Sequence, residues 1–158
     1  MLFRSGIDIA LGATASATAK DTIITNLGGV GIRVATTAGT AALEADHMNI
    51  SRVSSGVEAN QGGIATVSNS SIFGNGNGVV ASFTGAVMNS ANNVLANNNA
   101  GANASVAGAT VALTNNDIFA NNTGVSAAVG SFFVSGNDNK FSGNASNGAS
   151  PSSIMVIH

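Results

Sequence analysis

The chain has no cysteine, tryptophan or tyrosine, a single proline, and few charged residues. Without cysteine it can form no disulfide framework and carry out no thiol chemistry. Charged residues make up 8% of its 158 residues, against roughly 25% in ordinary globular domains. The five basic residues are too few for a nucleic-acid-binding surface. No apolar run approaches the roughly 18 residues needed for a membrane span. We therefore expect neither nucleic-acid binding nor a membrane span.

The residues that replace charge recur with a period in the low twenties. A glycine column comprises Gly31, Gly56, Gly78, Gly101, Gly124 and Gly148. An apolar column ahead of it comprises Ile23, Ile50, Ile72, Val94, Ile118 and Phe141. A further apolar column, seven residues earlier, comprises Leu43, Ala65, Val87, Val111 and Val134. Several columns in register at this period indicate a solenoid with one coil per repeat.

Within each repeat the apolar residues alternate, which is the pattern of a strand rather than a helix. Strands that return once per coil in one orientation must pair in parallel. The sequence therefore predicts an all-β, single-stranded parallel β-helix of about six coils, right-handed by the general crossover preference. We expect the repeats over residues 6–150 and a tail or cap over residues 151–158, whose apolar stretch 154–157 folds over the final coil. Residues 1–5 resemble a translated sequencing adapter, and we expect a non-native or unstructured start there.

Asparagine follows the first apolar column by three residues in five of six repeats. The predicted ladder comprises Asn26, Asn75, Asn97, Asn121 and Asn144, with Val53 as the exception. Asparagine tolerates left-handed backbone angles at tight turns, and stacked amides can hydrogen-bond along the axis. We expect these side chains to be buried and hydrogen-bonded. The glycine column indicates either positive φ or close approach of adjacent coils.

Two segments, Asn69–Val79 and Asn115–Val125, have the sequence N-x-x-I-x-x-N-x-x-G-V, close to a repeat of the form N-x-I-x-x-N-x-x-G-I/V, with weaker copies at Asn92–Ala102 and Asn137–Ala149. In these segments the chain resembles bacterial right-handed parallel β-helix repeat-containing proteins of the pectate-lyase-like superfamily. The resemblance extends from Gly6 to Ser150. It implies an extracellular, cell-surface or periplasmic protein whose signal peptide and earlier coils precede this chain.

Chemistry-bearing residues are sparse. Glu44 and Asp46 are expected on one strand face, roughly 7 Å apart by the strand rise, with His47 as a conceivable base; these three are weak catalytic candidates, and a solvated edge is the favoured interpretation. Arg33 and Glu58 are expected to form a surface ion pair across adjacent coils, with substrate binding as the weaker alternative. We expect no metal site and no cofactor.

Three functional hypotheses fit these observations. The first is a non-catalytic secreted or cell-surface segment that acts as a structural, adhesion or carbohydrate-binding scaffold. The alternative is part of a polysaccharide lyase or glycoside hydrolase whose catalytic coils lie upstream. An ice- or crystal-surface binder is disfavoured because no regular Thr-x-Thr column occurs. The partner would be a polysaccharide or cell-surface component, and self-association through the open N-terminal edge is expected, because exposed strand edges pair readily.

Overall fold

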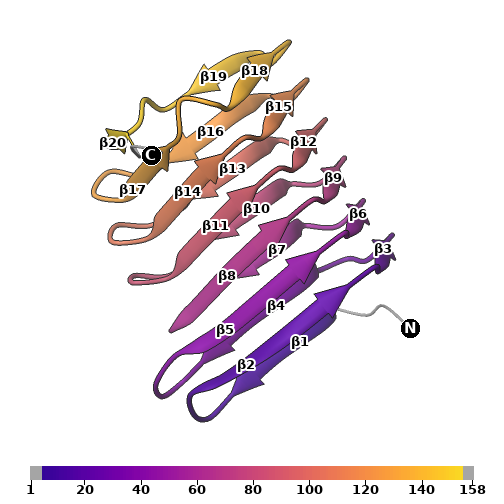
Figure 1. The fold of residues 1–158 in the computed structure, drawn as a ribbon, viewed down its shortest axis with the longest axis vertical. Helices are drawn as coiled ribbons and strands as arrows, with labels where there is room; N and C mark the ends of the chain where they lie inside the picture. The colour runs from indigo at the N-terminus through magenta and orange to yellow at the C-terminus, as the bar shows by residue number, and fades with distance from the viewer. Residues whose placement is uncertain (1–4, 155–158) are drawn as a thin grey trace.

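The computed structural model describes residues 5–154, which form a parallel β-solenoid of about six coils with no helix in this range (Figure 1). Each complete coil contributes one strand to each of three parallel sheets. The predicted fold class is therefore confirmed. Residues 1–4 and 155–158 lie outside the described residues, and with them most of the adapter-like start and of the apolar tail.

The strands are short and follow one another around the coil. Sheet A contains β1 (Ser5–Leu11), β4 (Val30–Thr36), β7 (Ser55–Ala59), β10 (Asn77–Ala81), β13 (Ala100–Ala104), β16 (Thr123–Ala127) and β19 (Ser146–Gly148). Sheet B contains β2 (Ala15–Lys20), β5 (Ala41–Asp46), β8 (Gly63–Ser68), β11 (Val87–Ala91), β14 (Thr110–Thr114), β17 (Phe132–Ser135) and β20 (Ser153–Ile154). Sheet C contains β3 (Ile23–Thr25), β6 (Asn49–Ser51), β9 (Ser71–Phe73), β12 (Val94–Ala96), β15 (Asp117–Phe119) and β18 (Lys140–Ser142).

Pairing continues on both sides of the expected range 6–150. Ser5 pairs with Val30, and β20 extends sheet B by pairing with β17 beyond Pro151.

The core lies between the sheets and consists of inward columns in which each side chain packs on its equivalent in the next coil. One such column in sheet A comprises Ile32, Val57, Val79, Ala102 and Val125, all buried.

Two of the predicted columns are displaced by one residue at some coils. The sheet C column passes through Ile24 and Leu95, not through Ile23 and Val94; Ile23 is 75% exposed. In a strand a shift of one residue exchanges the two faces, and at each of these positions two apolar residues are adjacent. The sheet B column likewise passes through Met88 and Phe133 instead of Val87 and Val134.

The glycine column reflects close approach of adjacent coils. A Cβ atom at Gly101 would lie 2.7 Å from the carbonyl oxygen of Gly124, and Gly31 stands in the same relation to Gly56. Of the six glycines predicted for this column only Gly148 has positive φ, at 85°, so close approach is the interpretation confirmed for the other five. Gly148 was misplaced in this column: it pairs with Val125, and Asn147 occupies the position next to Gly124.

A first asparagine ladder runs along the corner between sheets C and A. Its members are Asn75, Asn98, Asn121 and Asn144. The side-chain oxygen of each accepts a hydrogen bond from a backbone N–H group one coil earlier at 2.8–3.1 Å. The side-chain NH₂ group of each donates to a backbone carbonyl oxygen of that same earlier coil. The ladder is therefore as predicted at Asn75, Asn121 and Asn144.

Asn26 and Asn97 were wrongly included in the ladder. Both are exposed and precede the ladder corner by one residue, with φ of 60° and 54°. In the coil that contains Asn97, the buried ladder residue is Asn98. The error follows from the displaced apolar column, because Asn97 stands three residues after Val94 whereas Asn98 stands three residues after Leu95.

A second ladder, which the sequence analysis missed, runs along the corner between sheets B and C. It comprises Asn93, Asn116 and Asn139, whose oxygens accept from the N–H groups of Ser70, Asn93 and Asn116 at 2.8–3.1 Å. Their amide groups donate to backbone carbonyl oxygens of the preceding coil. The three residues are spaced by 23 positions, and that spacing was available in the sequence.

The ladder predicts that two neighbouring asparagines contribute very differently to the free energy of unfolding. Replacing Asn98 by Leu leaves the N–H of Asn75 and the carbonyl of Ile72 without their buried partner, and each such group should cost on the order of 1–3 kcal/mol. Replacing Asn97 by Gly, which suits positive φ, should change the free energy of unfolding by only a few tenths of a kcal/mol. Urea unfolding of both variants measures the difference. Equal stabilities would contradict the ladder.

The column that holds Asn97 also contains an alanine in a left-handed conformation. Ala120 is exposed and has φ of 54°, whereas its equivalents two coils earlier and one coil later are glycines. A left-handed conformation costs an L-residue roughly 1–2 kcal/mol, so Ala120→Gly should stabilise the protein by about 0.5–1 kcal/mol. The exposed Ala145, which does not have positive φ, is the matched control, and Ala145→Gly should destabilise. A destabilised Ala120→Gly variant would refute this account.

Candidate functional site

A polar groove crosses the outer face of sheet B near the N-terminal end of the solenoid. It has a volume of about 310 Å³ and is lined by Lys20 of β2, Glu44 and Asp46 of β5, and Thr66 and Ser68 of β8. The alternation of β5 directs Leu43 and Ala45 into the core and therefore directs the two carboxylates outward. A smaller hollow of about 170 Å³ shares Glu44 with this groove and is otherwise lined by residues 16–18 and Ala42.

Asp46 is the most constrained side chain of the groove. One carboxylate oxygen accepts hydrogen bonds from the amide of Asn69 at 2.8 Å and the hydroxyl of Ser68 at 2.9 Å. The other oxygen lies 2.9 Å from Nδ1 of His47. These hydrogen bonds, that of Asn69 foremost, hold the pKa of Asp46 well below its usual range. Asp46 is therefore an anion at neutral pH and has no proton to deliver.

The structure brings the three catalytic candidates to one place without joining them into a relay. His47 occupies a turn with φ of 52°, and its ring is largely exposed. Asp46 orients this ring, but the nearby hydroxyl of Ser68 donates to Asp46 and not to His47. Glu44 is exposed and makes no hydrogen bond or ion pair with any of residues 5–154. The arrangement offers hydrogen-bonding groups rather than a nucleophile with its base.

Arg33 and Glu58 are neighbours in the sheet A register, as expected, but the predicted ion pair between them is wrong. Arg33 instead binds Asp8 of the preceding coil through two hydrogen bonds, one of them from Nε at 3.0 Å. The hydrogen bond to Asp8 is the main cause of the raised pKa of Arg33, and the Asp8 and Glu58 charges add to it. Glu58 accepts hydrogen bonds from Asn60 and Ser82. An arginine between two acids can pair with either neighbour, and here the bidentate geometry to Asp8 prevails.

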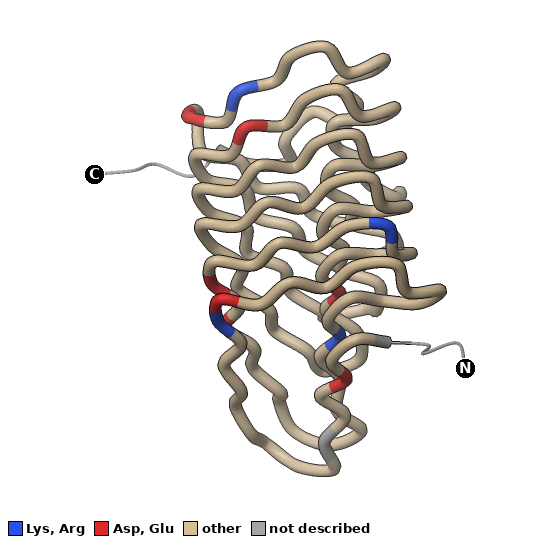
Figure 2. Tube along the Cα trace, turned by 90° about the vertical axis from the view of Figure 1, so that its right-hand side faces the viewer, with Lys and Arg blue, Asp and Glu red and all other residues tan. Residues whose placement is uncertain are grey.

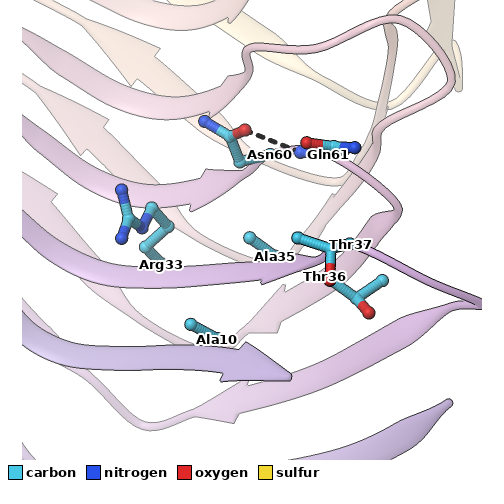
Figure 3. Close-up of a pocket in the computed structure, with 7 residues that line it drawn as sticks. All are labelled: Ala10, Arg33, Ala35, Thr36, Thr37, Asn60 and Gln61. Atoms are coloured by element: carbon cyan, nitrogen blue, oxygen red, sulfur yellow. Dashed lines mark hydrogen bonds between the residues drawn. The ribbon is translucent and has the colours of Figure 1, made fainter. Parts of the chain in front are cut away.

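A second small pocket lies where the long strand β4 meets the shorter β7 (Figure 3). Its volume is about 160 Å³, and it is lined by Ala10, Arg33, Ala35, Thr36, Thr37, Asn60 and Gln61. The backbone N–H of Gln61 donates to the side chain of Asn60 at 2.7 Å. Since Arg33 is engaged with Asp8, the pocket offers mainly methyl, hydroxyl and amide groups. We interpret this pocket as the space left where the longer strand β4 extends past the shorter strand β7 of the next coil.

Two further features, a metal-binding cluster and a membrane-spanning helix, are absent from the part of the chain that the structure describes. Residues 5–154 hold no group of three or more His, Asp or Glu side chains placed to bind a metal ion. Within the same range no helix has the length and apolarity that crossing a membrane requires. Comparison with protein-family models, curated proteins and solved structures gave no match for this chain. The β-solenoid is thus established by the structure alone.

The groove predicts a measurable carboxyl titration. Replacing Asn69, which has φ of 49°, by Gly keeps the turn but removes the main donor to Asp46, so the pKa of Asp46 should rise toward the ordinary value of about 3.9. A carboxyl whose folded pKa is depressed adds stability above its unfolded pKa and loses it as the pH falls. The variant should therefore lose less stability than the wild type between pH 5 and about pH 2.

Asn92→Gly is the matched control, because Asn92 has the equivalent turn position one coil later, with φ of 56°, and does not contact Asp46. Side-chain carbon NMR of the Asp46 carboxyl should give the wild-type titration in this variant. If the Asn69→Gly variant also titrates like the wild type, the assignment of Asn69 as the main donor is wrong.

Proposed function

We propose that this protein is a non-catalytic β-helix segment, secreted or held at the cell surface, that acts as a structural or carbohydrate-binding scaffold. The binding surface is the groove on the outer face of sheet B. The observation that carries the proposal is the hydrogen bonding of the two carboxylates in this groove. Asp46 is hydrogen-bonded by Asn69 and Ser68 and contacts His47, whereas Glu44 is exposed and has no hydrogen-bond or ion-pair partner among residues 5–154.

A polyol ligand needs donors and acceptors held at fixed positions. Glu44 supplies free acceptors for sugar hydroxyls, Lys20 supplies a donor, and Thr66 and Ser68 supply hydroxyl groups. All of these come from strands of one sheet, so they are positioned by the backbone ladder rather than by mobile loops. Glycoside cleavage by two carboxylates needs one of them to act as a proton donor; Asp46 cannot fill that role, which would fall to the exposed Glu44.

The proposed location outside the cytoplasm rests on the resemblance to bacterial right-handed parallel β-helix repeat proteins. A rod held together by backbone pairing and asparagine ladders needs no disulfides for stability.

The Asp46–His47 contact favours a second candidate function, a polysaccharide-active enzyme of the pectate-lyase-like type. A histidine oriented by a carboxylate can act as a general base when a substrate brings the group to be deprotonated. The two functions differ in turnover, so one experiment separates them.

The test is calorimetric titration with a panel of neutral and acidic oligosaccharides, together with a product assay. We expect binding that weakens about tenfold in Glu44→Gln, because a pair of charge-assisted hydrogen bonds is lost. Asp117→Asn, which alters a half-buried acid on sheet C that pairs with Lys140, should bind like the wild type. Release of unsaturated or reducing products, abolished by His47→Ala, would replace the scaffold by the enzyme.

A further inference from the structure

The middle of the solenoid carries no charge on any side. No Asp, Glu, Lys, Arg or His occurs between Glu58 and Asp117, a stretch that includes β8 through β14. Figure 2 shows the coloured charged positions in the coils toward each end of the rod, with uncharged coils between them. Sheet B is uncharged from β8 onward. The outer face of this sheet therefore changes from charged to neutral along the axis.

Two outward columns define this neutral part, which we call the neutral face. One comprises Ile64, Val87, Thr110 and Phe132, and the other comprises Thr66, Asn89, Ala112 and Val134. Successive members of a column lie roughly 4.8 Å apart, the strand spacing of a sheet. Apolar groups thus stand beside hydroxyl and amide groups in a regular array.

Large apolar side chains are exposed on and beside the neutral face. Phe132 is 52% exposed and Ile64 is 37% exposed. Phe83 and Val129, in the loops that lead into β11 and β17, are 42% and 97% exposed. Exposed apolar groups that gather on one face, with polar groups at their edges, mark interaction sites. The repeat pattern did not predict surface positions for Phe83 and Phe132 in this chain without Trp or Tyr.

We propose that the neutral face binds the uncharged sugar residues of a polysaccharide, in continuity with the groove. The inference rests on the proposed scaffold function and names its ligand class: a neutral glycan rather than a polyuronate. Thr66 belongs to both surfaces, so a chain seated in the groove extends directly over β11, β14 and β17.

The charge distribution selects this occupant. An acidic polymer lying on the neutral face would bring its carboxylates against a surface that has no cation to replace their water, and a desolvated charge without a partner is costly. A neutral pyranose presents apolar C–H groups on its faces and hydroxyl groups around its rim. The C–H groups can pack on Phe132, Val87 and Ile64, while Asn89 and Thr110 bind hydroxyl groups.

The test compares a neutral and an acidic polymer, with phosphoric-acid-swollen cellulose and polygalacturonate as the probes. We expect the full chain to bind swollen cellulose with an affinity that does not change between low and high salt, because no ion pair contributes. Polygalacturonate should bind at least about tenfold more weakly. Preference for polygalacturonate, or affinity that falls with salt, would overturn the proposal.

Two variants alter the neutral face in different ways. Phe132→Ala removes an exposed apolar platform, and Thr110→Lys places a charge in the array; each should weaken cellulose binding about tenfold or more. Ile23→Lys is the matched control, since Ile23 is 75% exposed on sheet C, and it should bind like the wild type. Thermal unfolding establishes that all three variants are folded. Cellulose binding unaffected by both face variants would refute the neutral face.

The remaining outcomes separate this inference from the function on which it rests. If glycans bind and only Glu44→Gln weakens them, the groove is the site and the neutral face is not. If neither polymer binds, the neutral-face inference fails, whereas the oligosaccharide titration still decides whether the groove binds carbohydrate. If sedimentation shows a dimer that Phe132→Ala dissociates, the neutral face is an interface between two copies, and the glycan assignment is wrong.

Discussion

Backbone groups at the corners of the coil have no strand partner, and the rest of the structure depends on how they are satisfied. The sheets pair every strand with its copies above and below, but the chain must turn sharply between sheets. At two of these corners an asparagine column supplies a donor and an acceptor for each coil that the column spans. Because buried unpaired backbone groups are costly, the ladders allow corners that are both tight and dry.

This constraint explains the unusual composition. Tight corners leave little room for insertions, so most side chains that could carry chemistry stand on the outer faces of the sheets, with a few, such as His47, at the turns. Glycine is required where adjacent coils approach too closely for a Cβ atom, as at Gly101. The result is a rod whose variation is confined to outward columns, and function is expressed by which groups those columns present.

The architecture could be predicted from the sequence because each column repeats a physical requirement, and repetition averages out local ambiguity. The sequence did not define the inward residue wherever two apolar residues are adjacent, as at Val94 and Leu95, since either could face the core. The inward residue in turn determines whether Asn97 or Asn98 belongs to the ladder. The outward positions of Glu44 and Asp46 followed from strand alternation. The partner of Arg33 did not, because Asp8 and Glu58 flank it equally in the register and only side-chain geometry separates them.

The ladders also have a direction. Every ladder asparagine reaches back to the coil that precedes it, so each coil is fastened by the one that follows. Val53, and Leu27 one coil earlier, occupy the ladder corner in the first two coils, and neither can fasten a predecessor. During synthesis the ribosome delivers coils in this same order, so each newly emerged repeat locks the turn made just before it. The rod is thus suited to growing from its first coil toward its last, with the most recent coil always the one still open.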